Sequence, residues 1–217
     1  TADDGLGGTV TTTFEITVEA SGSDIIYRTD FEDDAVGSIP DGYNVIVNKD
    51  DVADENFFGI AADTGKDKAL KNNMRAKVAG TIGTITYGFQ DKDGNPAKYT
   101  GLLSFEAQIY HKVDVYEQIV YLSNGPVESA DTRLMSIVLN NTDLVKNNVK
   151  INIYNHKEGS KDYILEGISV PTDVWTSLRV VLDTDAKLAY VTIGDNAPVE
   201  ISMDLKDDVE LALGGFT

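Results

Sequence analysis

Apolar and polar side chains alternate with a period of two along most of this sequence, and that alternation constrains the fold more than any other feature. The apolar members of one such run, LSFEAQIYH, are Leu103, Phe105, Ala107 and Ile109. The same alternation recurs in VKINIYNH, SLRVVLD, AYVTIGD and VEISMDL. Residues two apart point to the same side of a strand, so these segments predict strands that each bury one face. The best helical candidate is a short turn in or near DVADENFF.

Turn-forming residues separate these runs. DTDAK (183–187) lies between two alternating segments, and DKDGNP (91–96) lies between TITYGFQ and KYTGLLSFEA. Both predict hairpin turns, and in DTDAK we expect the aspartate side chains to bond to the backbone. Many short strands joined by such turns, with almost no helix, predict an all-β chain folded as an antiparallel β-sandwich of jelly-roll type.

The net charge of −18, from 18 basic and 36 acidic residues, bears on the partners of the chain. So acidic a surface would repel nucleic acid and anionic lipid, whereas calcium, neutral polysaccharide and simple solubility are all compatible with it. The chain contains no cysteine, so no disulfide framework is expected. No apolar stretch approaches the roughly 20 residues that cross a bilayer, so we expect no membrane insertion. Thr1 does not open a basic and then apolar leader, and we expect the chain to be part of a longer protein.

The first residues differ in character from the rest. TADDGLGGTVTTTFEITVEASGS combines an acidic, glycine-rich turn, a threonine-rich strand and a small polar linker. This segment resembles the closing strand of an extracellular immunoglobulin-like or cadherin-like repeat, which implies that residues 1–23 are the tail of a preceding module. The alternative is that the strand forms an edge of the main sandwich. In either case we expect residues 24–217 to form the jelly roll.

Four stretches of the main body carry a resemblance to a known family: DFEDDAVGSIPDGYNV (30–45), GKDKALKN (65–72), LLSFEAQIYH (102–111) and WTSLRVVLDTDAKLAYVTIGDN (175–196). They resemble concanavalin A-like, laminin-G-like jelly-roll modules, as found among the carbohydrate-binding modules of secreted bacterial polysaccharide-degrading enzymes. The chain departs from that pattern at LALGGFT, where it stops before the usual aromatic closing strand. Either that strand is missing, or an N-terminal strand takes its place.

The resemblance also implies a role for the acidic stretch around Phe31, which we expect to anchor an early strand. Related jelly rolls often hold a structural calcium ion near an early acidic residue, which implies Asp30 and Glu32 as ligands. Calcium takes six to eight hard oxygen ligands, so carboxylates suit it. The alternative is a solvated turn. DKDGN resembles the start of an EF-hand loop, but its twelfth position is Leu102 rather than the bidentate glutamate, so we interpret it as a turn.

A sugar-binding face follows if the apolar residues of the central strands all point to the core. Their polar and aromatic neighbours would then converge on one sheet surface, where rings stack on sugar C–H groups and amides, carboxylates and arginine bind hydroxyls. The alternative is an ordinary exposed β face, because tyrosine and threonine favour strands. We expect Trp175 to be a core anchor. The predicted ligand-binding residues are Glu106, Gln108, Tyr110, Asn152, Tyr154, His156, Arg179 and Tyr190.

Signatures of catalysis are missing from the sequence. The Glu-x-Asp-x-x-Glu spacing of retaining glycoside hydrolases of this fold does not occur, and the only histidines are His111 and His156. We therefore predict a non-catalytic carbohydrate-binding module of a secreted or surface-attached bacterial multidomain protein, with a polysaccharide or glycan as its partner. The alternatives are a laminin-G-like adhesion or spacer domain and a polysaccharide lyase or hydrolase.

Overall fold

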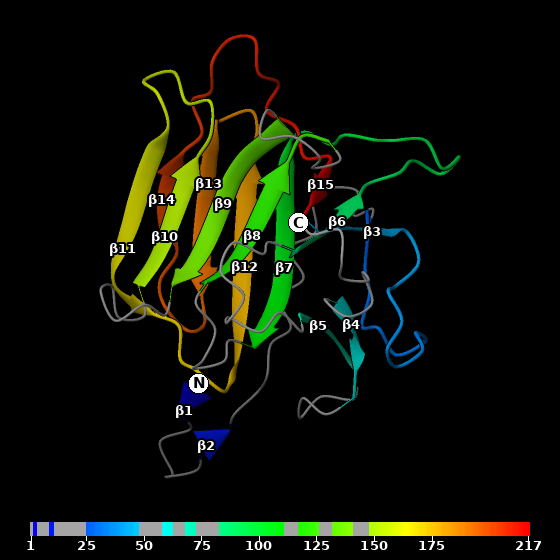
Figure 1. Ribbon diagram of the computed structural model, residues 1–217. Helices are drawn as coiled ribbons and strands as arrows, with labels where there is room; N and C mark the ends of the chain where they lie inside the picture. The colour runs from blue at the N-terminus through cyan, green and yellow to red at the C-terminus, as the bar shows by residue number, and fades with distance from the viewer. Residues whose placement is uncertain are drawn as a thin grey trace.

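The computed structural model describes residues 2–3, 9–10, 25–47, 58–62, 68–72, 83–110, 117–125, 132–140 and 148–217. Within these residues the regular elements are β-strands, and every strand pairing is antiparallel. None of the described segments forms a helix that is long and apolar enough to cross a membrane. Two sheets lie face to face, and Figure 1 shows the larger one in front of the smaller one.

The larger sheet has seven strands. In spatial order they are β11 (Lys161–Ser169), β10 (Asn148–Ile153), β9 (Arg133–Asn140), β8 (Glu117–Ser123), β15 (Gly215–Phe216), β6 (Gly83–Gly88) and β3 (Tyr43–Val47). The smaller sheet has four strands, in the order β14 (Val199–Ser202), β13 (Leu188–Ile193), β12 (Trp175–Asp183) and β7 (Leu102–Tyr110). Two short pairs complete the description: β4 (Phe58–Ala61) with β5 (Ala69–Asn72), and β1 (Ala2–Asp3) with β2 (Thr9–Val10).

The chain crosses repeatedly from one sheet to the other. It leaves the larger sheet after β6, forms β7 in the smaller sheet, returns for β8, and crosses again between β11 and β12. After β14 it crosses once more, and β15 enters the larger sheet between β8 and β6. Such winding of antiparallel strands over two facing sheets is that of a jelly roll, so the predicted fold class is confirmed.

The predicted alternation is clearest in β12, where Thr176, Leu178, Val180 and Leu182 are buried and the residues between them are partly exposed. The core lies where these side chains meet the inner face of the larger sheet. Ile137 of β9 and Ile151 of β10, which pair directly, are completely buried there. Apolar burial between the two sheets is the main force that holds them together.

Aspartates stabilise both predicted hairpin turns. The Asp183 carboxylate accepts hydrogen bonds from the backbone of Asp185 at 3.1 Å and Ala186 at 2.8 Å. The Asp91 carboxylate accepts from the backbone of Asp93 at 2.8 Å and Asn95 at 2.9 Å. These bonds favour the charged form and lower the pKa of Asp91. The interpretation of both segments as turns is confirmed.

The expectation that Phe31 anchors an early strand was wrong. Phe31 does not anchor a strand: it lies in a bend at a φ of 64°, half-buried, with its ring 6.3 Å from that of Tyr43. The consecutive turn and bend residues from Phe31 to Asp34 explain this, because the chain reverses there instead of extending.

The helical turn expected in DVADENFF lies outside the described residues except for Phe58, which begins β4. Most of the strand expected in residues 1–23 lies outside them too.

Candidate functional site

The predicted ligand-binding residues do not share one surface. Strands β7, β12 and β13 belong to the smaller sheet, whereas β10 belongs to the larger one. The outer faces of a sandwich point in opposite directions, so convergence on a single face was a wrong prediction. The outer side of the smaller sheet carries Glu106, Gln108, Tyr110, Arg179 and Tyr190, and that of the larger sheet carries Asn152 and Tyr154.

His156 lies on neither outer face. It follows β10, is only 3% exposed, and forms an isolated bridge with Leu205. Its Nδ1 accepts a hydrogen bond from the backbone amide of Glu158 at 3.2 Å. These contacts give His156 a structural place between the two sheets.

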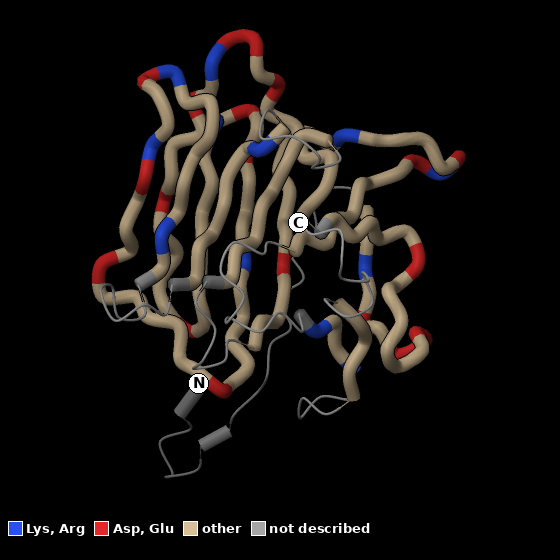
Figure 2. Tube along the Cα trace, in the orientation of Figure 1, with Lys and Arg blue, Asp and Glu red and all other residues tan. Residues whose placement is uncertain are grey.

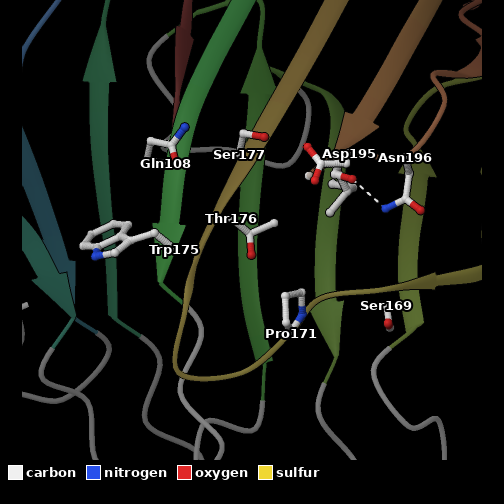
Figure 3. Close-up of a pocket in the computed structure, with 10 residues that line it drawn as sticks. Gln108, Ser169, Pro171, Trp175, Thr176, Ser177, Asp195 and Asn196 are labelled. Carbon is white, nitrogen blue, oxygen red and sulfur yellow. Dashed lines mark hydrogen bonds between the residues drawn. The ribbon is translucent and has the colours of Figure 1, made fainter. Parts of the chain in front are cut away.

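A pocket of about 460 Å³ opens at one end of the smaller sheet. Three parts of the chain build it: the start of β12 with the neighbouring Gln108 of β7, the turn after β13, and the segment that crosses from β11 to β12. Figure 3 shows these side chains around the cavity, with Gln108 and Trp175 on one side and Asp195 and Asn196 on the other. Its volume is in the range of sites that bind small molecules.

Trp175 lines this pocket instead of the core. It is the first residue of β12 and has the outward parity of Ser177 and Arg179. In the ladder between β12 and β7 it pairs with Tyr110, and the two ring centroids lie 5.4 Å apart at an interplanar angle of 59°. The expectation of a core anchor was wrong. The buried positions of β12 begin at Thr176, so Trp175, one residue earlier, points to the outer side of the sheet.

Asp195 and Asn196, in the turn between β13 and β14, supply part of the polar lining. The side-chain amide of Asn196 donates to the carbonyl of Ile193 at 2.7 Å, drawn as a dashed line in Figure 3. The backbone amide of Gly194, at a φ of 55°, donates to Ser177 at 2.7 Å. These bonds fix the turn against β12 and hold Asp195 at the rim. Gln108 and Ser177 add an amide and a hydroxyl from the strands.

Thr176 borders the same pocket from the buried side of β12. Thr176 is 8% exposed, and among the described residues its Oγ1 has no hydrogen-bond partner. A buried polar group without a partner costs about 1–3 kcal/mol, so such groups are nearly always satisfied by protein, water or ligand. The Thr176 hydroxyl is therefore a buried polar group behind the surface of the pocket.

Beyond the pocket, the outer side of the smaller sheet is polar. Glu106 and Arg179 face each other in register and form an ion pair, with 3.1 Å between Oε1 and Nε. Ser104 donates to the same carboxylate oxygen at 3.2 Å. Tyr190 pairs with Glu200 on the neighbouring strand, and desolvation together with that carboxylate raises the pKa of the Tyr190 hydroxyl. Of the residues predicted from the sequence, only Gln108 lines the pocket itself, with Tyr110 beside it.

The predicted calcium ligands, Asp30 and Glu32, lie in the loop before β3 and do not line the pocket. The Asp30 carboxylate accepts from the backbone amide of Glu32 at 3.2 Å. The Glu32 carboxylate accepts from the backbone amide of Lys68 at 2.9 Å. In the described part of the chain, no three acidic, histidine or cysteine side chains are grouped so that they would hold a metal ion.

No protein-family model matches the sequence, and no curated protein matches it. Similar solved structures include Xenopus laevis galectin-Ib, with 10% identity over 56% of this chain and 86% of that chain at a TM-score of 0.44. They also include the CBM40 of a Ruminococcus gnavus IT-sialidase bound to α2,3-sialyllactose, with 11% identity over 60% of this chain and 70% of that chain at 0.39. The alginate lyase AlyC3 shows 12% identity over 61% of this chain and 65% of that chain, also at 0.39. TM-scores this low identify no function.

Proposed function

We propose that this chain is a non-catalytic carbohydrate-binding module that takes a sugar in the Trp175 pocket. The observation that carries the proposal is the lining of that pocket, where one aromatic ring stands among amide, hydroxyl and carboxylate groups. A sugar needs both kinds of contact, because its C–H face is apolar and its hydroxyls both donate and accept hydrogen bonds.

Charge favours a neutral sugar at this site. Among the described residues that line the pocket only Asp195 is charged. An anionic sugar in the pocket would meet repulsion from this carboxylate, since charges of like sign lower the local concentration of a ligand. A neutral sugar does not, and its hydroxyls donate to the Asp195 carboxylate in charge-assisted hydrogen bonds.

The pocket supports binding better than hydrolysis. A retaining glycoside hydrolase needs two carboxylates about 5 Å apart. The described lining of the pocket contributes one, Asp195. The proposal therefore places the chain as a glycan-binding, secreted or surface-attached module within a longer bacterial protein, with other modules of the same parent chain as neighbours.

The experiment uses Trp175 as its own reporter, because it is the single tryptophan of the chain. Its emission is recorded while soluble neutral oligosaccharides of plant and microbial origin are added, and calorimetry confirms each hit. We expect a saturable change for at least one of them. Trp175→Ala should weaken that binding at least about tenfold, as loss of a buried aromatic contact does at interfaces.

Val174→Ala is the matched control, because Val174 is adjacent and 47% exposed but does not line the pocket. It should bind like the wild-type chain, and thermal melting checks that both variants fold. If no neutral glycan changes the emission or releases heat, the proposal is wrong, and a spacer or adhesion domain becomes the better interpretation.

A further inference from the structure

A second cluster of polar and aromatic side chains lies on the outer side of the larger sheet, away from the Trp175 pocket. Tyr121 of β8, Ser136 of β9 and Asn152 of β10 are direct neighbours across the three strands. Tyr154 follows two residues after Asn152 on the same side, and Arg133 begins β9. We call these five residues the Arg133 cluster.

Arg133 is held in place by aromatic rings. Its guanidinium carbon lies 4.3 Å from the ring centroid of Tyr121 and 6.0 Å from that of Tyr154. The register shifts between Leu122 and Ser123, so that Ser123 pairs with Arg133. Such irregularities re-aim a side chain, and here the shift accompanies a guanidinium lying over the Tyr121 ring. Stacking of this kind orients the planar fork of an arginine before any ligand arrives.

Hydrogen bonds order the rest of the cluster. The Asn152 amide donates to Ser136 Oγ at 3.0 Å, and the Tyr154 hydroxyl lies 3.4 Å from the same oxygen. Ser136 itself is completely buried. The bond from Asn152 fixes the orientation of its amide, so its carbonyl oxygen Oδ1 points in a defined direction.

Two buried atoms of this cluster are without hydrogen-bond partners among the described residues: Nε of Arg133, a donor, and Oδ1 of Asn152, an acceptor. Arg133 and Asn152 as whole residues are partly exposed, so a ligand that brings a negatively charged acceptor and a hydroxyl donor together can approach them from solvent. An arginine fork binds a carboxylate by two parallel hydrogen bonds, and the strength of such pairs comes from this geometry. A uronic acid carries a carboxylate and hydroxyls on one ring.

We infer that the Arg133 cluster is a second binding site, for a uronic acid residue of an acidic polysaccharide. The carboxylate binds the guanidinium of Arg133, a sugar hydroxyl donates to Asn152, and the ring packs beside Tyr121 and Tyr154. A neighbouring cation on this side, Lys150, forms an ion pair with Asp162 at 2.8 Å. That pair neutralises the carboxylate that lies next to Asn152 in the sheet.

The test compares two probes by calorimetry: a trigalacturonate, and the same trisaccharide after chemical reduction of its carboxylates to alcohols. We expect the wild-type chain to bind the acidic form at least tenfold more tightly. Arg133→Gln should abolish that preference. Lys92→Gln removes the same charge at a 90% exposed position outside the cluster and should change the affinity less than threefold.

Arg133→Lys separates binding from folding, because it keeps the charge and loses the fork. It should melt like the wild-type chain and still lose most of the affinity for the acidic probe. Equal binding of both probes, or unchanged affinity in a folded Arg133 variant, overturns the inference. An acidic peptide that binds as tightly as the trigalacturonate overturns the assignment to a sugar.

The outcome is independent of the Trp175 pocket. Trp175→Ala should leave the affinity for the trigalacturonate unchanged, because the two sites lie on opposite sides of the sandwich. A loss of uronide binding in that variant would place the acidic sugar in the pocket instead, and would contradict the second site.

Discussion

Lys68 donates two hydrogen bonds to Glu32. Its backbone amide donates to the Glu32 carboxylate at 2.9 Å, and its ammonium group donates to the Glu32 carbonyl oxygen. The same ammonium group donates to the carbonyl of Asp34 at 2.8 Å. The acidic loop before β3 is thereby tied to the residue that precedes β5, and Gly37 and Ser38 continue the attachment through backbone bonds to Ile60 of β4. One part of the acidic stretch thus serves a structural purpose.

Replacing Lys68 with methionine should loosen this loop. The variant keeps the length of the side chain but leaves two carbonyl oxygens without their charged donor, and hydrogen bonds to charged groups contribute about 1.5–3 kcal/mol each. We expect a lower free energy of unfolding in urea. Lys92→Met is the control, because Lys92 is 90% exposed and should be nearly neutral. Equal stability of the two variants would contradict a structural role for Lys68.

Calcium at Asp30 and Glu32 remains a prediction, and the Lys68 contacts sharpen it. Because an ammonium group already binds the carbonyls of Glu32 and Asp34, a calcium ion here would depend on the carboxylates. Chelation should then lower the melting temperature of the wild-type chain, since an ion that binds only the folded state stabilises it. Asp30→Asn should melt at the lower temperature with or without chelator. If the chelator leaves the wild-type melting temperature unchanged, the prediction of a calcium site at Asp30 and Glu32 is wrong.

The sequence predicted strands wherever one face is buried and the other is wet. In β12 that condition holds at every residue, and the alternation is visible. In β9 it fails, because Leu134 to Leu139 are all buried and no period remains in RLMSIVLN. A strand whose successive side chains are all buried shows no alternation to reveal it.

The candidate site was harder to predict than the fold. Alternation tells which residues share the side of a strand, but sheet membership depends on pairings between distant segments, such as β7 with β12. The sequence therefore could not tell that Asn152 and Arg179 lie on different sheets. The alternation does not indicate Asp195 and Asn196, because they lie in a turn at the end of the stretch 175–196 that carries the family resemblance. Arg133 was missed because its position depends on an irregular register.

Acid should weaken the contact between the β10–β11 connection and the β14–β15 connection. Both lie at one end of the sandwich, where Figure 2 shows acidic residues (red) at the tips. Lys157 lies 3.3 Å from Asp204 and 3.2 Å from Asp207. The hydrogen bond from Lys157 lowers the pKa of Asp204 below its ordinary value of 3.8. A carboxyl group whose pKa is lower in the folded state stabilises the fold above the unfolded pKa, and that stability is lost as the pH falls through the folded pKa.

Asp204→Asn should therefore lower the melting temperature at neutral pH. The further fall of the melting temperature below pH 4 should be smaller than in the wild-type chain. Asp208→Asn is the matched control, because Asp208 is an exposed carboxylate of the same connection. Salt should shrink the difference between the two variants, since exposed pairs are screened. Identical acid profiles for the two variants would mean that the Lys157 contacts contribute nothing.

Gly215 should be the least replaceable residue of the closing strand β15. A Cβ atom at this position would lie 2.5 Å from the backbone oxygen of Tyr87 on β6, and a backbone atom in a paired strand cannot move aside cheaply. We expect Gly215→Ala to lower the free energy of unfolding by about 1–3 kcal/mol, as overpacking does. Gly125→Ala is the control, because its nearest contact, a methyl group of Thr132, is 3.9 Å away. Urea unfolding measures both, and a Gly215→Ala chain as stable as the control would show that β15 does not pack against β6 this closely.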